Sequence, residues 1–83
     1  MDLIRGQVVI SLTGRDKGRY MVVLMPEDGF AYVADGKLRR IIQPKKKNSK
    51  HLALTKTVFE ENKLDNDKSL QKAIIEAFGA ERR

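Results

Sequence analysis

The stretch Gly14-Arg15-Asp16-Lys17-Gly18 separates two runs that are rich in apolar, β-branched residues, at 7–13 and 20–25. Glycine adopts positive φ at little steric cost, so two glycines placed this closely allow the chain to reverse in a tight turn. The residues between the glycines are all charged, and the tip of the turn must therefore face water. This pattern predicts a β-hairpin with a charged loop.

The charges of this loop allow two interpretations. In the first, they are solvated side chains on an ordinary surface turn. In the second, the loop is rigid and basic, because Arg15, Lys17 and Arg19 outnumber Asp16, and it binds an anion. The sequence of the loop alone does not decide between these two interpretations, so evidence from the rest of the chain is needed.

The runs beside the loop have the patterns of strands. Val8, Ile10 and Leu12 share one face of the first run, which predicts a half-buried strand. The second run is apolar on both faces and suits a strand that is covered on both sides. Further strands are expected at 30–34, 37–42 and 51–55, with turns at 26–29 and 35–36 and a polar loop at 45–50. Short strands joined by tight turns predict a small antiparallel barrel.

The C-terminal part of the chain has the period of a helix. Asn66 or Asp67 can cap a helix that runs from about Lys68 to Phe78, and Gly79 supplies the residue that ends it. The apolar stripe of this helix consists of Leu70, Ala73, Ile74, Ala77 and Phe78. A helix of about eleven residues is marginal alone, so we expect it to dock on the barrel or, alternatively, on another protein. For residues 58–64 the sequence allows two alternatives, a loop or a frayed turn.

Charge is the strongest compositional signal. Lysine and arginine number 17 against 11 acidic residues, a net charge of +6. We divide the chain into a barrel at 1–58, with a net charge of +7, and a C-terminal extension at 59–83, with a net charge of −1. A basic body with a near-neutral tail indicates a polyanionic partner for the body, the alternative being a basic protein without one.

Length and composition exclude several classes of protein. A chain of 83 residues forms one domain. It has no cysteine, which excludes a cysteine zinc site and fits a reducing compartment. The sequence shows neither the apolar segment of a signal peptide nor a run long enough to span a membrane. We therefore expect a soluble, cytoplasmic protein that is a monomer when free.

Gly6-Gln7-Val8-Val9 followed by Gly14-Arg15-Asp16-Lys17-Gly18-Arg19 resembles a KOW motif, the short β unit of several ribosomal proteins and of bacterial transcription elongation factors. Residues 33–40 and 50–55 resemble the KOW-bearing large-subunit ribosomal proteins of archaeal and eukaryotic type and their small bacterial relatives. KOW units adopt an SH3-like barrel, so the resemblance agrees with the strand pattern. The expected fold is mainly β: a small SH3-like antiparallel barrel of about five strands with a C-terminal α-helix.

Basic side chains gather in the second half of the barrel sequence. Lys37 and Arg39 would share one face of the strand at 37–42, and the lysine-rich loop at 45–50 would leave the end of that strand. Lysine binds phosphates as a point charge, and arginine adds a bidentate grip. The alternative for the lysine run is a solvated, disordered loop. The predicted RNA-binding residues are Arg15, Lys17, Arg19, Lys37, Arg39, Arg40, Lys45, Lys46, Lys47, Asn48, Lys50 and His51.

The sequence does not favour catalysis or a metal site. A nucleophile needs a base within reach, and His51 is the only histidine. Without cysteine, a metal would need carboxylates around His51, and none is near it in the sequence. We therefore predict a protein that is not an enzyme and that uses no cofactor and no metal.

The aromatic residues bear on the mode of binding. Phe30, Tyr32 and Phe78 are expected in the core, so base stacking on a broad aromatic platform is disfavoured. Recognition of folded RNA by its shape and its phosphates fits better. A peptide-binding SH3 adaptor is disfavoured, because such grooves rely on clustered aromatics and this chain has no tryptophan.

The resemblance and the charge together predict a noncatalytic RNA-binding protein. The resemblance implies ribosomal RNA or the ribosomal particle as the partner, with the chain acting either as a core subunit or as an auxiliary factor. The alternative is a transcription- or translation-factor module that binds a protein partner through the barrel. Salt separates the two, because phosphate binding weakens steeply as salt rises and apolar docking does not.

Overall fold

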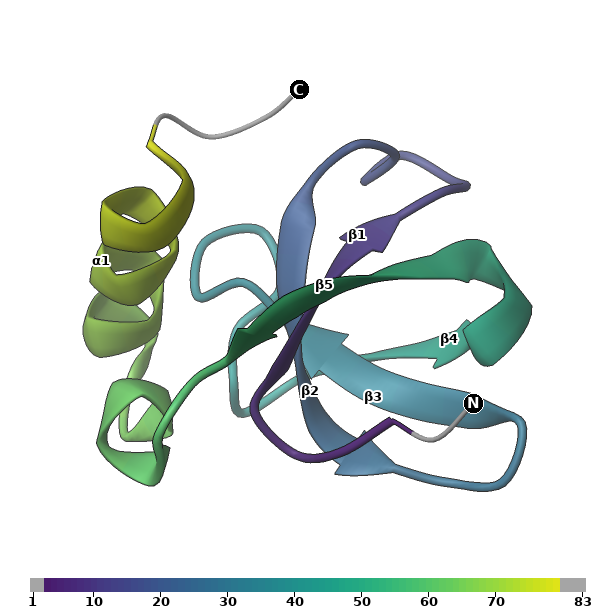
Figure 1. Ribbon diagram of the computed structural model, residues 1–83, viewed down its shortest axis with the longest axis horizontal. Coiled ribbons are helices and arrows are strands. Elements are labelled where there is room, and N and C mark those ends of the chain that lie inside the picture. Colours follow the sequence, from purple (N-terminus) through teal and green to yellow (C-terminus); the bar gives the residue numbers. More distant parts are fainter. Residues whose placement is uncertain (1–2, 80–83) are drawn as a thin grey trace.

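The hairpin around Gly14 joins the first two strands of a five-stranded antiparallel sheet (Figure 1). The computed structural model describes residues 3–79. Its strands are β1 (Gln7–Ser11), β2 (Tyr20–Pro26), β3 (Phe30–Ala34), β4 (Lys45–Asn48) and β5 (Leu52–Val58). They pair in the order β4-β3-β2-β1-β5, and each pair is antiparallel. The predicted fold class is confirmed: the protein is mainly β, a small SH3-like barrel with one C-terminal helix.

Three helical segments complete the chain. The 3₁₀ turn η1 (Ser49–His51) connects β4 to β5, and the 3₁₀ turn η2 (Glu61–Leu64) precedes the helix α1 (Asp67–Phe78). The side chain of Asn66 accepts a hydrogen bond of 2.8 Å from the backbone N–H of Ser69, and Gly79 ends α1 with a φ of 79°. The predicted caps of the helix are therefore confirmed.

The sheet has a hydrophobic cluster on each of its faces. Inside the barrel lie Val9, Met21, Val23, Ala31, Val33 and Leu52. On the outer face, Val8, Val22, Leu24 and Ala34 pack against Leu64, Leu70 and Ile74. The expectation of a half-buried first strand is wrong, because α1 covers the outer face of the sheet and both Val8 and Val9 are fully buried. The ring of Tyr20 stacks on that of Phe78 at 4.1 Å, which joins β2 to the last turn of α1.

Residues 37–42 do not form the predicted strand but belong to a loop. The carboxylate of Asp35 accepts hydrogen bonds from the backbone N–H groups of Lys37 and Arg39, both at 2.9 Å, which folds the chain back on itself. The carboxylate of Asp67 then accepts a hydrogen bond of 2.8 Å from the N–H of Ile41. Two aspartates therefore satisfy backbone groups that a strand would have paired with its neighbour.

The lysine run, predicted to be a polar loop, is the strand β4. In its ladder with β3, Lys45 lies opposite Val33, Lys46 opposite Tyr32 and Lys47 opposite Ala31. Because successive side chains of a strand point to opposite faces, Lys47 points into the barrel and Lys46 points outward. His51 belongs to η1 rather than to the closing strand, which runs from Leu52 to Val58.

Gly36 is one of the residues through which this loop contacts α1, and its replacement by alanine should destabilise the protein. Its φ is 80°, and an added Cβ would clash with the backbone carbonyl of Asp67. We expect Gly36→Ala to lower the free energy of unfolding by more than about 2 kcal/mol, as measured by urea denaturation. Gly29 is the matched control, since it also has a positive φ but open space around it, so Gly29→Ala should cost about 1 kcal/mol. Equal losses would mean that the contact with α1 is unimportant.

Candidate nucleic-acid interface

The β1–β2 hairpin loop and η1 lie side by side at the end of the barrel opposite α1 (Figure 1). The N–H of Leu12 donates a hydrogen bond of 2.9 Å to the carbonyl of His51. The ammonium group of Lys47 donates one of 2.7 Å to the carbonyl of Thr13. The glycine-flanked loop and the lysine-rich segment are therefore in contact.

A buried ion cluster holds this end of the barrel together. The carboxylate of Asp16 accepts hydrogen bonds from the Ser11 hydroxyl at 2.8 Å and from Lys47 Nζ at 3.0 Å, and Lys45 Nζ lies 3.8 Å away. The side chains of Asp16 and Lys47 are each only 6% exposed. Burial is the largest influence on Asp16 and raises its pKa. The hydrogen bonds from Ser11 and Lys47 and the charges of Lys47 and Lys45 outweigh it, so the pKa of Asp16 is lowered.

This cluster changes the role of two predicted site residues. Lys47 is buried and satisfied by Asp16 and Thr13, so it stabilises the barrel. Lys45 is partly exposed, and its charge is shared with Asp16. Asn48 also has a structural bond, because its side chain accepts a hydrogen bond from the N–H of Lys50 and caps η1.

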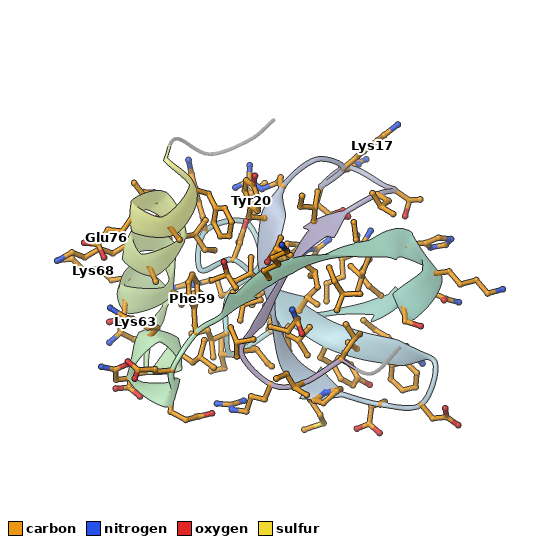
Figure 2. All side chains as sticks on the ribbon, viewed as in Figure 1. Lys17, Tyr20, Phe59, Lys63, Lys68 and Glu76 are labelled. Carbon is orange, nitrogen blue, oxygen red and sulfur yellow. The ribbon has the colours of Figure 1, made fainter. Side chains whose placement is uncertain are left out.

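Five of the predicted residues carry exposed side chains on this end of the barrel. We define the basic end as Arg15, Lys17, Lys46, Lys50 and His51. Lys17 points away from the barrel on the side opposite Lys63 and Lys68 (Figure 2). Within residues 3–79, none of the five side chains pairs with a carboxylate.

Two acidic residues mark the border of the basic end. Glu27 and Asp28 lie in the turn between β2 and β3, and both are exposed. The carbonyl of Gly29 in this turn accepts hydrogen bonds from the N–H and the hydroxyl of Ser49, at 3.0 and 3.1 Å, which places the turn beside η1. The turn therefore bounds the surface available to an anion, which extends from η1 to the hairpin loop in one direction and along β4 to Lys46 in the other.

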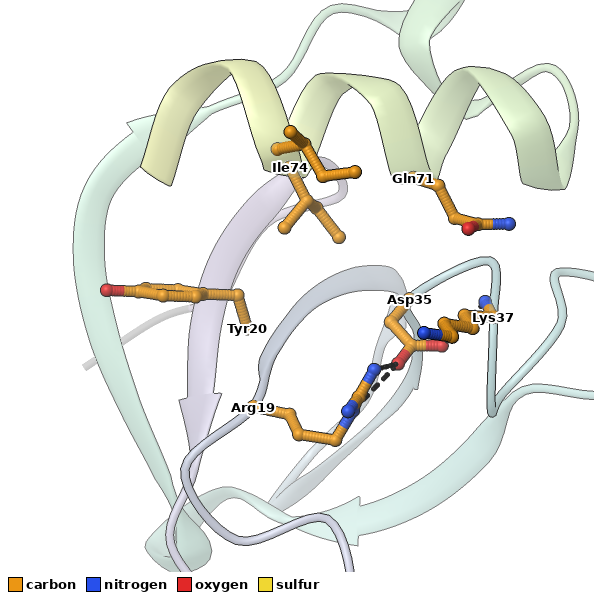
Figure 3. Close-up of a pocket in the computed structure, with 7 residues that line it drawn as sticks. Arg19, Tyr20, Asp35, Lys37, Gln71 and Ile74 are labelled. Atoms are coloured by element: carbon orange, nitrogen blue, oxygen red, sulfur yellow. Dashed lines mark hydrogen bonds and ion pairs between the residues drawn. The ribbon is translucent and has the colours of Figure 1, made fainter. Parts of the chain in front are cut away.

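The remaining predicted residues, Arg19, Lys37, Arg39 and Arg40, lie outside the basic end. Arg19 directly follows the hairpin loop, but its side chain is directed toward α1, and the other three belong to the loop after β3. Arg19 forms an ion pair of 3.0 Å with Asp35, and Figure 3 shows both residues beside Gln71 and Ile74 of α1. Arg40 pairs with Asp67 at 3.3 Å. The strand that was to carry Lys37 and Arg39 toward the lysines is absent from residues 3–79. The structure thus separates this group from the basic end.

The pocket between α1 and the barrel is small. It has a volume of about 20 Å³ and is lined mainly by Arg19, Tyr20, Asp35, Gln71 and Ile74 (Figure 3). This is room for about one water molecule. The Nε2 group of Gln71 donates a hydrogen bond of 2.8 Å to the carbonyl of Gly36, so the polar lining serves to dock α1.

Phe30 and Tyr32 are not core residues, contrary to the prediction. Both are half-buried on the outer face of β3, whereas Ala31 and Val33 point into the barrel. Their rings lie edge to face with centroids 5.7 Å apart, and Lys46 Nζ lies 4.2 Å from the centre of the Phe30 ring. The strand alternation alone could have placed the two aromatics on one face, but not identified that face as the outer one.

Three further findings bear on the function. Residues 3–79 contain no group of three or more histidine, cysteine or acidic side chains that could hold a metal ion. In the same part of the chain, no helix has both the length and the apolar character needed to cross a membrane. No protein-family model and no curated protein matches the chain.

Proposed function

We propose that this chain is a noncatalytic RNA-binding protein that binds RNA phosphates through the basic end. The observation that carries the proposal is the meeting of the hairpin loop with η1, which gathers exposed cations from separate parts of the chain. Ribosomal RNA or the ribosomal particle is the partner implied by the resemblance to KOW proteins. The net charge of +6 supports a polyanionic partner.

The chemistry of the basic end suits a phosphate backbone. Lys17, Lys46 and Lys50 present compact charges on flexible side chains, and Arg15 adds a planar group that binds two oxygens at once. These side chains have no carboxylate partner among the described residues, so binding a phosphate would not break an internal ion pair. The loop that holds Arg15 and Lys17 is fixed from below by the buried Asp16, which limits the entropy lost on binding.

Removing the charges of the basic end should weaken RNA binding and its dependence on salt. We expect the variant Arg15→Ala, Lys17→Ala, Lys46→Ala, Lys50→Ala to lose affinity for all RNAs that the protein binds. The slope of log K against log salt should become shallower by about three, because about four phosphate contacts are lost. Fluorescence anisotropy with a labelled RNA stem-loop at several salt concentrations measures both quantities.

A matched control removes the same charge elsewhere. The variant Lys56→Ala, Lys63→Ala, Lys68→Ala, Lys72→Ala has the same net charge, but its changes lie on β5, η2 and α1. We expect it to keep nearly the wild-type slope. If the two variants lose affinity equally, binding follows net charge and the basic end is not the site.

One observation favours the alternative of a protein-binding module. The side chains of Leu38 and Ile42 are 61% and 85% exposed in the loop that follows β3. Single exposed apolar side chains are common on protein surfaces, but two in one loop form a patch to which a protein partner can bind. Binding of a protein through this loop would be insensitive to salt and to the loss of the basic end.

A further inference from the structure

The helix α1 covers only one part of the outer face of the sheet. Val22 lies opposite Ala34 in the ladder between β2 and β3, and both are buried under α1. Farther along the ladder, Met25 lies opposite Tyr32, and Met25 is 53% exposed. The outer face therefore continues beyond the helix as a partly bare surface.

This bare surface combines aromatic rings with a cation. Tyr32 and Phe30 are in edge-to-face contact, and Lys46 lies over the ring of Phe30. Lys46 is held in place there by the register of β4, which sets it opposite Tyr32. Aromatic rings and a nearby cation are the two elements with which proteins bind single-stranded nucleic acid.

A groove adjoins the ring of Tyr32. It has a volume of about 510 Å³ and is lined by Arg5, Leu24, Met25, Tyr32, Ile41 and Pro44. The groove is open rather than enclosed, so it presents a mainly apolar surface on which a flat ring can lie. Arg5 lines the groove and already donates hydrogen bonds to Glu61 and to the carbonyl of Leu24. The hydroxyl of Tyr32 has no hydrogen-bond partner in the part of the chain that is described.

We propose that this groove holds an unpaired base of the bound RNA, stacked on Tyr32, with Lys46 binding the adjacent phosphate. The inference rests on the proposed function and names the feature of the RNA that the protein selects. It requires an RNA with a flipped-out or single-stranded nucleotide beside a structured segment, because paired bases cannot enter a groove of this kind.

Continuity with the basic end favours a nucleotide over an apolar peptide. Lys46 belongs to the basic end and lies over the ring of Phe30, which is in edge-to-face contact with Tyr32 of the groove. Asn48 of the same strand caps the turn that carries Lys50. A strand of RNA whose phosphates follow Lys50 and Lys46 would thus bring its next base to Tyr32. The hydroxyl of Tyr32 lies in the plane of the ring, where it offers a hydrogen bond to the sugar or phosphate of the stacked nucleotide.

The test uses the intact protein and two RNAs of equal length. One is a stem-loop with 2-aminopurine at an unpaired position, and the other is a fully paired duplex. Stacking on an aromatic ring quenches 2-aminopurine fluorescence, so we expect quenching on binding of the stem-loop. Tyr32→Leu should abolish the quenching and weaken stem-loop binding about tenfold, without changing the salt slope.

Two further variants separate a stacking role from a structural one. Tyr32→Phe keeps the ring and should retain the quenching. Ile75→Ser changes an apolar side chain of α1 that is 51% exposed and lies away from the groove, so it should behave like the wild type. Thermal unfolding by circular dichroism confirms that each variant is folded at the temperature of the assay.

The outcomes distinguish the two proposals. Steep salt-dependent binding of both RNAs, with no quenching and no effect of Tyr32→Leu, overturns the base site and leaves the proposed function standing. Absence of salt-dependent binding to either RNA overturns the proposed function and the base site with it. A proline-rich peptide that perturbs the NMR signals of the Tyr32 ring, while RNA does not, would assign the groove to peptides and also overturn the inference.

Discussion

Lys47→Ala is expected to lower the free energy of unfolding by about 3–5 kcal/mol, the cost of removing one partner from a buried ion pair. The substitution removes the hydrogen bonds of 3.0 Å to Asp16 and of 2.7 Å to the carbonyl of Thr13. It leaves the carboxylate of Asp16, which is 5% exposed, with Ser11 and the more distant Lys45. Urea denaturation followed by circular dichroism measures the loss.

Lys46→Ala is the matched control for this prediction. Lys46 is the neighbouring lysine of the same strand, but it points outward and contacts the ring of Phe30. Its removal should cost less than about 1 kcal/mol. Similar losses for the two variants would show that the Asp16–Lys47 pair contributes little to stability. The double variant Asp16→Asn, Lys47→Met should recover part of the stability, because no buried charge is left unpaired.

The dependence of stability on acid pH should also reveal the Asp16–Lys47 ion pair. Because the pKa of Asp16 is lowered in the folded protein, its contribution is complete above the unfolded value of about 3.9 and is lost as the pH falls through the folded value. The wild type should therefore lose stability below about pH 4. In Lys47→Ala the pKa of Asp16 rises, since burial is less opposed, and the loss with falling pH should be less steep. Parallel pH profiles for the two proteins would contradict the assignment.

The elements that were predicted correctly have local causes. The hairpin follows from glycines beside β-branched runs, and α1 follows from Asn66, an apolar stripe and Gly79. Each of these signals lies within a few residues of the element that it specifies. The sequence allowed α1 to dock either on the barrel or on another protein. In the structure it docks on the barrel, where the rings of Tyr20 and Phe78 stack on each other.

The fourth strand could not be predicted, because its causes are distant in the sequence. Three consecutive lysines have low strand propensity, and the run becomes β4 because Asp16 neutralises Lys47 from the first hairpin. Conversely, the turn at 35–36 predicts a strand at 37–42, but the carboxylates of Asp35 and Asp67 bind the backbone of these residues. In both cases carboxylates override the local pattern, and two of them, Asp16 and Asp67, are distant in the sequence from the segment that they bind.

The candidate site was predicted only in part, for the same reason. Sequence shows which residues are cations, but not which of them are neutralised within the fold. Arg15, Lys17 and Lys50 are exposed, whereas Lys47 and Arg19 pair with buried aspartates. The groove at Tyr32 was missed because the docking position of α1 decides which part of the outer face stays exposed, and the sequence does not show that position.

Leu70→Ala is expected to lower the free energy of unfolding by about 2–5 kcal/mol, the range for truncating a fully buried leucine. Leu70 is 0% exposed, and it lies in the cluster that joins α1 to Val8 and Val22. A helix of 12 residues is marginal in isolation, so this contact is what keeps α1 folded. Ile75→Ala is the control on the same helix, because Ile75 is 51% exposed and should cost less than about 1 kcal/mol.

The same variant separates the function of the helix from its role in stability. The basic end lies on the opposite side of the barrel from α1 (Figure 1). Below its midpoint of unfolding, Leu70→Ala should therefore bind RNA with nearly the wild-type affinity and salt slope. A loss of affinity in the folded variant would place part of the RNA contact on α1 or on the cations beside it, Arg39 and Arg40. Arg40 forms an ion pair with Asp67 at the start of the helix, so that result would place the RNA interface beside α1 rather than at the basic end.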